Sequence, residues 1–286
     1  MGDPVDASAV AATAAGMLGS FPNIKIGLVV GIGGTAPSSK HNLRLGDVVV
    51  SAPLDRVESR FPYRFGEGMQ ERMFDMTSSL VQPQTLLRTA VNRLKADYQT
   101  GGHKIEENIS SALERFPHYR QMCRRPQSTS DELHKSTVNH PLCTEGDCTT
   151  SCGNDVWMLV SQPERTQVED KSVVHYGLIA PKGQVMKDTI LQDMIIREED
   201  VLFSDMVAAG SMDYFPCLAI RGICGCSDSD KNEEWRDYTA MAAAACAWDL
   251  IQNISLEQIT PEKRIIDVRP SREEVYSRFS RRGTGT

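Results

Sequence analysis

Short apolar runs that alternate with helical patterns constrain the fold of this chain more than any other feature. The runs "IKIGLVVGIGG" (24–34), "VVHYGLIA" (173–180) and "CLAIRGIC" (217–224) are almost continuously apolar. Such runs are typical of strands covered on both faces of a parallel sheet. Helical patterns such as "PQTLLRTAVNRLKADY" (83–98) and the Ala-rich "EWRDYTAMAAAACAWDLIQ" (234–252) separate or follow them. The alternation predicts an α/β fold with a mostly parallel sheet.

The first helix is expected within residues 8–21, "SAVAATAAGMLGSF". Its residues are small, and Val10, Ala14, Met17 and Leu18 fall on one helical face. We therefore expect this face to pack tightly against the sheet.

Length and composition favour one large domain with appendages. The chain has 286 residues, of which 40% are hydrophobic and 24% charged. We assign residues 1–252 to the domain. Within it, residues 101–170 are rich in Ser, Thr, Pro, Cys and charge, with little periodicity, which indicates a mobile peripheral insertion. Residues 253–286 are charged and end in Gly and Thr, so we expect a surface tail.

The charge balance bears on the partners. A net charge of −7 argues against a nucleic-acid-binding surface and favours small molecules or proteins as partners. No apolar run approaches the roughly 20 residues that span a bilayer, and the N-terminus lacks a basic segment before an apolar core. We expect a cytoplasmic protein that does not bind membranes.

The eight cysteines are interpreted as reduced thiols because no secretory signal is present. Four residues in the middle of the chain could in principle surround a zinc ion. Their spacings are irregular and no CxxC pair occurs, which favours a reduced cysteine-containing loop. We therefore expect no metal and no cofactor. The residues that would surround such a zinc ion are His140, Cys143, Cys148 and Cys152.

No nucleophile is indicated by a motif. The chain has no G-x-S-x-G, and nothing in the sequence joins a particular Ser or Cys to a His. Cys224 and Cys226 flank Gly225 at the end of an apolar run, and we interpret both as small packing residues.

Glycines follow the first strand in "VVGIGGTAP" (29–37). Gly31, Gly33 and Gly34 would let backbone N–H groups approach an anion or a sugar. A tight turn from strand to loop explains them equally well. The spacing matches neither a dinucleotide fingerprint nor a P-loop.

Several segments, in this order, resemble the purine and uridine phosphorylase superfamily: "FPNIKIGLVVGIGG", "LRLGDVVVS", "VVHYGLIA…GQVMKD", "MVAAGSMDYFPCLAIRGIC" and "DSDKN". The resemblance runs from Gly2 to about Gln252 and is greatest to nucleoside phosphorylase-like domains of filamentous fungi, which are often joined to ankyrin or NTPase modules. It implies a three-layer α/β fold with a mixed, mostly parallel, partly closed sheet flanked by helices. It also implies cleavage of the N-glycosidic bond of nucleosides, with phosphate as a possible co-substrate or with water.

The resemblance implies two losses of catalytic groups. The acid that protonates the leaving base stands in relatives at the position of Gly225, and glycine has no proton to give. Asp228 matches a second Asp of the fungal relatives and is only a weak substitute. The Met-Glu pair that holds the ribose corresponds to Met206 and Val207, and valine cannot accept hydrogen bonds from sugar hydroxyls, which cost about 1–3 kcal/mol each when buried without an acceptor.

Other positions of the family's ligand pocket are retained. The glycine turn that faces the sugar corresponds to Gly33 and Gly34, and the family's residue under the ribose corresponds to Met206. The segment that packs on the base corresponds to Gln184, Val185 and Met186.

The relatives' first strands have no counterpart before Met1. We expect this to expose a sheet edge or a face of the first helix, and we expect a homo-oligomer.

Three functions remain open at this point. The first is a nucleoside phosphorylase- or nucleosidase-like protein that acts on or binds a nucleoside or a similar planar ligand. The second is a repurposed enzyme of a fungal specialised-metabolite pathway that acts on a non-nucleoside substrate. The third is a non-catalytic ligand-sensing module.

Overall fold

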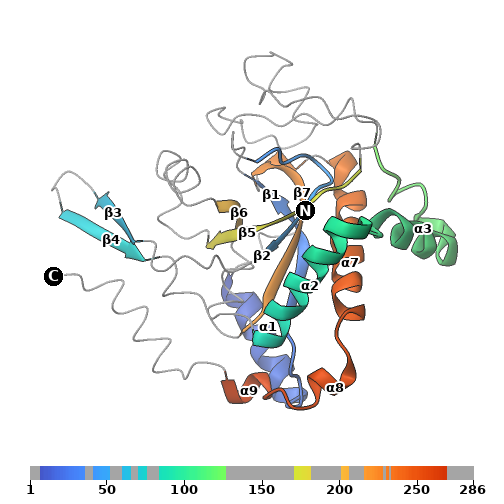
Figure 1. Cartoon of the computed structure of the whole chain (residues 1–286). Helices are drawn as coiled ribbons and strands as arrows, with labels where there is room; N and C mark the ends of the chain where they lie inside the picture. The colour runs from blue at the N-terminus through green and yellow to red at the C-terminus, as the bar shows by residue number, and fades with distance from the viewer. Residues whose placement is uncertain are drawn as a thin grey trace.

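The computed structural model describes residues 7–35, 41–51, 60–65, 70–75, 84–126, 171–181, 201–205, 216–227, 230–231 and 233–268. A sheet of six strands lies at the centre (Figure 1), with the order β1-β7-β2-β5-β6 and with β8 beside β7. The strands are β1 (Leu28–Gly34), β2 (Val48–Ser51), β5 (Val174–Pro181), β6 (Val201–Asp205), β7 (Leu218–Ser227) and β8 (Asp230–Lys231).

The main path of the sheet is mixed but mostly parallel. Three of its neighbouring pairs are parallel, namely β1 with β7, β2 with β5 and β5 with β6, whereas β2 and β7 are antiparallel. One edge of the sheet therefore joins the ends of β1 and β7 to the starts of β2, β5 and β6. We call this edge the rim, and its members are Gly34, Gly225, Asp47, Val173 and Leu202.

The two outermost strands of the path, β1 and β6, also meet at the rim. The Thr35 hydroxyl, directly after β1, donates a hydrogen bond of 2.5 Å to the Leu202 carbonyl. Thr35 is buried at 1% exposure, so this bond is sheltered from water. The sheet is therefore curled and partly closed, as the sequence predicted.

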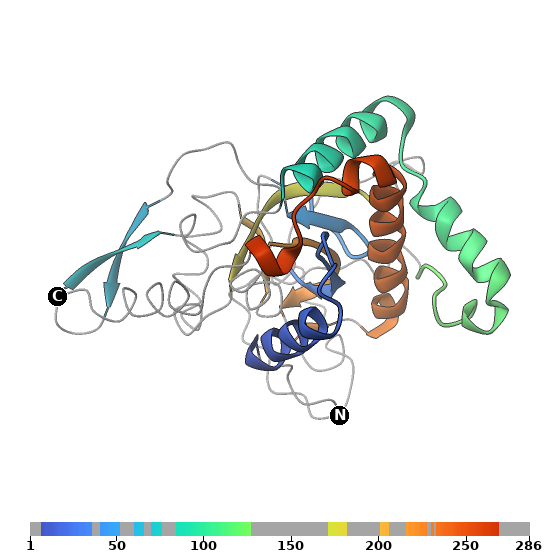
Figure 2. The same ribbon diagram turned by 90° about the horizontal axis from the view of Figure 1, so that it is seen from below.

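Helices flank the sheet on more than one side, and Figure 2 shows α1 and α2 with strands between them. The prediction of a three-layer α/β fold with a mixed, mostly parallel sheet is confirmed. The helices are α1 (Ala7–Ser20), α2 (Thr85–Gly101), α3 (Ile105–Arg115), α7 (Glu233–Gln252), α8 (Leu256–Ile259) and α9 (Ile265–Val268), with a 3-10 turn η1 (Pro117–Tyr119). A separate antiparallel hairpin consists of β3 (Arg60–Phe65) and β4 (Gln70–Asp75).

Close packing of α7 on the sheet follows from small residues on both sides. Ala242, Ala243 and Cys246 of α7 are fully buried. Opposite them, a Cβ added at Gly222 of β7 would overlap with the methyl group and the backbone carbonyl of Thr239. Small side chains thus let the helix lie directly on the strand, where interiors are close-packed.

The sequence interpretation was wrong about two segments. Ile105 and Ile109 of α3 are buried in the core, so residues 105–115 are not a peripheral insertion. The helical period was missed because only a few apolar residues stand among charged ones. In the expected tail, Ile265 is 1% exposed and its N–H donates to the Ile24 carbonyl, so α9 is also part of the packed body. Residues 127–170 and 269–286 lie outside the described residues.

The first helix and the first strand are less covered than their apolar patterns alone predict. Ala14 and Leu18 are buried as predicted, but Met17 is 45% exposed. In β1, whose neighbour in the sheet among the described strands is β7, Val30 is 39% exposed. An edge position leaves one side of the strand open, which explains the difference.

Within the described part of the chain, none of the helices combines the length and apolar character needed to cross a membrane.

Candidate functional site

The glycine ends of β1 and β7 meet at the rim. Gly34 is in register with Gly225, and a bulge between Gly33 and Gly34 shifts the pairing there. The next N–H, that of Thr35, donates to the Gly225 carbonyl at 2.9 Å. The structure thus brings together three positions that the resemblance singled out, the two glycines of the sugar turn and the position of the lost acid.

The described hydrogen bonds of these glycines involve neutral groups. Gly33, Gly34 and Gly225 are all buried. The Cys224 thiol lies 3.6 Å from the Gly33 carbonyl and donates to it. Cys224 is fully buried, in agreement with its interpretation as a packing residue. The described contacts here therefore involve backbone groups, the Thr35 hydroxyl and the Cys224 thiol.

The other predicted site residues lie outside the described residues. This holds for the weak acid candidate Asp228 and for the zinc candidates of the middle segment. It holds as well for the base and ribose positions Gln184, Val185, Met186, Met206 and Val207.

Gly31 has a different role from the one expected for a glycine loop. It lies inside β1, in register with Arg221 of β7. A Cβ at Gly31 would overlap with the guanidinium of Arg221, which is only 4% exposed. The glycine at this position makes room for a buried arginine and not for a ligand.

A second group of side chains at the rim surrounds Asp47, which the sequence interpretation did not select. Asp47 is fully buried. Its carboxylate accepts hydrogen bonds from the N–H groups of Arg44 (3.0 Å) and Val173 (2.9 Å). His175 Nε2 lies 3.0 Å from Oδ2. One carboxylate thus holds the turn before β2 and the start of β5 together.

The local sequence explains the buried position of the Asp47 carboxylate. Gly46 has φ of 86°, a conformation that suits glycine, and its N–H donates to the Ile223 carbonyl of β7. This turn directs Asp47 away from solvent. A Gly-Asp dipeptide directly before an apolar run is a local turn signal, and it was the available signal for this group.

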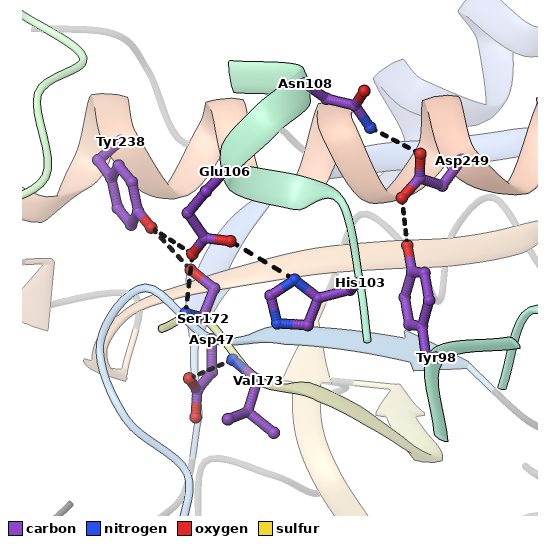
Figure 3. Close-up of polar contacts among 9 residues, drawn as sticks. All are labelled: Asp47, Tyr98, His103, Glu106, Asn108, Ser172, Val173, Tyr238 and Asp249. Carbon is purple, nitrogen blue, oxygen red and sulfur yellow. Dashed lines mark hydrogen bonds and ion pairs between the residues drawn. The ribbon is translucent and has the colours of Figure 1, made fainter. Parts of the chain in front are cut away.

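Glu106 performs a similar task from α3 (Figure 3). Its Oε1 accepts from the N–H of Ser172 at 3.1 Å and from the hydroxyl of Tyr238 at 3.4 Å. The hydroxyls of Ser172 and Tyr238 are 2.9 Å apart. His103 Nδ1 lies 3.4 Å from Oε2. Two carboxylates therefore fix consecutive residues, Ser172 and Val173, at the start of β5.

A third polar contact joins three helices. Asp249 of α7 accepts from the Tyr98 hydroxyl of α2 at 2.7 Å and from the Asn108 amide of α3 at 2.6 Å (Figure 3). These groups bond to each other within the packed layers, so the geometry gives them a structural role.

The described cysteines are not activated. Burial raises the pKa of the Cys217 thiol to about 12, and burial together with Asp249 raises the pKa of Cys246 to about 12. Reactive cysteines have a lowered pKa and access to solvent. The described residues also contain no group of three His, Cys, Asp or Glu side chains placed to hold a metal ion.

No protein-family model matches the chain. Among curated proteins it is similar to a nucleotide-binding leucine-rich repeat (NLR)-like protein of Hyaloscypha variabilis, with 32% identity over 244 residues. The match covers 85% of this chain but only 23% of that protein, so the chain spans about a quarter of the length of this relative.

Solved structures with similarity to the chain include nucleosidases. One is the 5'-methylthioadenosine/S-adenosylhomocysteine nucleosidase of Helicobacter pylori, at 11% identity and a TM-score of 0.38, covering 87% of this chain and 77% of that one. Another is the corresponding nucleosidase of Neisseria meningitidis, at 12% identity and a TM-score of 0.39, covering 87% and 78%. The futalosine hydrolase of Helicobacter pylori matches at 12% identity and a TM-score of 0.37, covering 87% and 76%. Values this low do not assign an activity to the chain.

Proposed function

We propose that this chain is a nucleoside phosphorylase- or nucleosidase-like protein that binds a nucleoside or a similar planar ligand at the rim. The observation that carries the proposal is the pairing of Gly34 with Gly225, two positions that the resemblance assigns to the sugar turn and to the acid. Ligands of α/β proteins bind in the crevice at the ends of strands. The sequence resemblance supports the assignment because its motifs occur in the family's order.

We expect the chain to bind its ligand but to cleave it slowly or not at all. General acid catalysis contributes about 10²- to 10⁴-fold to rate, and it requires a proton donor within hydrogen-bond reach of the leaving group. Gly225 has no side chain that could donate a proton, and the described hydrogen bonds of Gly33 and Gly225 run to a backbone N–H and to the Cys224 thiol. We therefore expect slow or absent release of free base, whether or not phosphate is present as co-substrate.

Two measurements on the full chain test the proposal. Isothermal titration calorimetry with adenosine, inosine, uridine and methylthioadenosine should detect saturable binding of at least one nucleoside. Chromatography of the same mixtures, with and without phosphate, should detect little free base. A chain that binds none of the four would contradict the nucleoside assignment.

Restoring the lost groups tests the position of the site. Gly225→Asp combined with Val207→Glu should raise base release from a nucleoside that the unmodified chain binds. The matched control is Gly225→Asn with Val207→Gln, which has similar shape but no acid. Equal activity of the two double variants would show that position 225 does not supply the proton.

A second candidate is an enzyme of the same fold that acts on a non-nucleoside substrate. The observation that favours it is the loss of acid and sugar clamp while β1, β2, β5, β6 and β7 still form the sheet. It predicts no nucleoside binding in the calorimetric titration and no gain of base release in the restored variant.

A further inference from the structure

The turn that follows α3 has a composition unlike the rest of the chain. Residues 115–125, "RFPHYRQMCRR", contain four arginines and no Lys, Asp or Glu. They belong to a chain with a net charge of −7. We call residues 115–125 the arginine turn. It follows α3, which Figure 2 shows beside α7.

Large apolar side chains of the arginine turn face water. Phe116 and Tyr119 are each 48% exposed, and Met122 is 59% exposed. Single exposed apolar residues are normal on a protein surface. Three of them within seven positions, interleaved with exposed arginines, form a local apolar and basic surface. The exposed arginines are Arg115, Arg120 and Arg124.

The backbone of the arginine turn is ordered by its own hydrogen bonds. The N–H of Tyr119 donates to the Phe116 carbonyl at 3.1 Å, and that of Cys123 donates to the Tyr119 carbonyl at 2.9 Å. Cys123 is 8% exposed and anchors the far end of the turn. A ligand would therefore meet a surface whose ordering entropy has already been lost.

The side chains of the arginine turn also contact one another. The His118 and Tyr119 rings are 4.0 Å apart between centroids, and the Phe116 and His118 rings are 6.4 Å apart. The Arg115 guanidinium lies 5.7 Å from the centre of the Phe116 ring. These contacts limit the rotamers of the exposed rings while leaving about half of each in water.

Arg125 differs from the other arginines because it points inward. Its guanidinium lies 5.8 Å from the Trp235 ring and 5.7 Å from the Tyr238 ring of α7. This contact attaches the arginine turn to the core. The exposed cations are thus three, and the acidic group nearest in sequence is the exposed Glu114 at the end of α3.

We propose that the arginine turn is a docking site for an acidic peptide segment that also carries an aromatic or aliphatic side chain. Arginine pairs with carboxylates through two parallel hydrogen bonds, a geometry that lysine cannot supply. Arg, Tyr, Phe and Met are enriched at protein interfaces, whereas Lys, Glu and Asp are depleted, as in this segment. The site is separate from the rim and does not depend on the proposed nucleoside binding.

A nucleic acid fits these observations less well than a peptide. Binding to single strands uses a basic groove that follows many phosphates, with strong salt dependence. The arginine turn has three exposed cations on a chain of net charge −7, which repels a long polyanion at a distance. A segment with a few carboxylates avoids this repulsion.

Fluorescence anisotropy with the full chain tests the proposal. The probe is a labelled peptide of roughly twelve residues with four glutamates and two phenylalanines on a Gly/Ser background. Comparison peptides replace each Glu by Lys, or each Phe by Ala. We expect saturable, salt-sensitive binding of the probe, about tenfold weaker binding without Phe, and none with Lys. Absence of saturable binding of the probe at millimolar chain concentration would overturn the proposal.

Variants with matched charge locate the site. Arg120→Glu with Arg124→Glu should weaken binding of the probe by about tenfold or more. The control is Arg88→Glu with Arg93→Glu, which changes two exposed arginines of α2 and the same amount of charge, and it should bind within twofold of the unmodified chain. An equal loss of peptide affinity in both double variants would show that only the net charge of the chain matters, and it would overturn the proposal.

Two further measurements complete the test. Tyr119→Ala removes an exposed ring without changing charge, and it should weaken binding by about fivefold while far-UV circular dichroism stays unchanged. An oligo-dT of similar length serves as the nucleic-acid probe. If it binds more tightly than the peptide and displaces it, the arginine turn is a nucleic-acid site and the peptide proposal is wrong.

Discussion

At the rim, the ends of β1 and β7 lie beside the starts of β2 and β5, yet the two pairs are built from opposite kinds of residue. The first pair ends in Gly34 and Gly225, and the Gly225 carbonyl accepts a hydrogen bond from the N–H of Thr35. The second pair begins at Asp47, whose buried carboxylate accepts from the backbone and from His175. We call them the glycine side and the carboxylate side.

The two sides differ in what their side chains contribute to the structure. On the carboxylate side, Asp47 and Glu106 use their oxygens to hold the turn before β2 and the start of β5. On the glycine side, Gly225 contributes no side chain. Ionisable residues near a strand end are therefore no sign of catalysis until their hydrogen bonds have been assigned. Four experiments test this contrast.

The largest effect is expected for Asp47→Ala on the carboxylate side. The change leaves the N–H of Val173 and the ring of His175 without their buried acceptor, so the free energy of unfolding should fall by about 3–5 kcal/mol. Urea denaturation measures this change. Asp97→Ala, at a carboxylate that is 54% exposed, is the control and should stay within about 0.5 kcal/mol. Similar values for the two would mean that Asp47 does not hold the strands.

On the glycine side, Gly222→Ala should lower the free energy of unfolding by about 3 kcal/mol. The new methyl group would overlap with the Thr239 side chain and its carbonyl, and backbone cannot move aside as a flexible side chain can. Gly16→Ala in α1 is the control, because a Cβ there meets nothing within 4 Å. It should raise the free energy of unfolding by about 0.5–1 kcal/mol. Thermal or urea denaturation of both variants measures these changes, and a similar loss of stability in Gly16→Ala and Gly222→Ala would contradict the predicted overlap.

Alkaline pH tests whether groups buried in the packed body stay neutral. Burial raises the pKa of Cys217 directly before β7, of Cys246 on α7 and of Tyr238 beside Glu106 to about 12 each. Below the ordinary pKa of these groups the folded and unfolded chains bind the same protons. Above it the unfolded chain loses protons first, so stability falls as pH rises toward 12. From the two thiols alone, roughly 2 kcal/mol should be lost between pH 10 and pH 11.

Urea midpoints recorded from pH 8 to pH 11 measure this loss. A stability that stays constant across the range would show that the thiols are ionised equally in both states. Replacing Cys246 by Ala should make the free energy of unfolding fall less steeply with rising pH. Each variant is compared with its own stability at pH 8.

The smallest effects distinguish two tyrosines near the carboxylate side. Tyr98→Phe removes a 2.7 Å hydrogen bond to Asp249 and should lower the free energy of unfolding by about 1.5 kcal/mol. Tyr176→Phe should change it by less than about 0.5 kcal/mol or raise it, because within the described part of the chain the buried Tyr176 hydroxyl has no hydrogen-bond partner. A loss in Tyr176→Phe as large as in Tyr98→Phe would reveal a partner for that hydroxyl.

The strands and the long helices were predictable from local sequence. Leu87, Ala90, Val91 and Leu94 follow a helical period, and all are buried in α2. The apolar run Val48–Val50 of β2 directly follows Gly46 and Asp47 in the sequence, and all three valines are fully buried. These signals are strong because burial of a helix face or a strand leaves a short, regular apolar pattern.

The contacts of the site were not predictable in the same way. Asp47 bonds to Val173 and His175, which stand 126 and 128 positions away in the chain. No local pattern specifies such pairings, which follow from strand order. The resemblance did identify Gly33, Gly34 and Gly225, but their register opposite one another came only from the structure. The helix α3 was missed because few of its residues are apolar.

The pairing of the first described strand with one of the last has a consequence for biosynthesis. Gly33 and Cys224, which touch at the rim, are 191 positions apart. At translation rates of about 5–20 residues per second, β1 leaves the ribosome roughly 10–40 s before β7 has been made. During that interval the uncharged segment LVVGIGG is complete but its neighbouring strand does not exist. The nascent chain therefore has a period in which chaperone binding to β1 competes with aggregation.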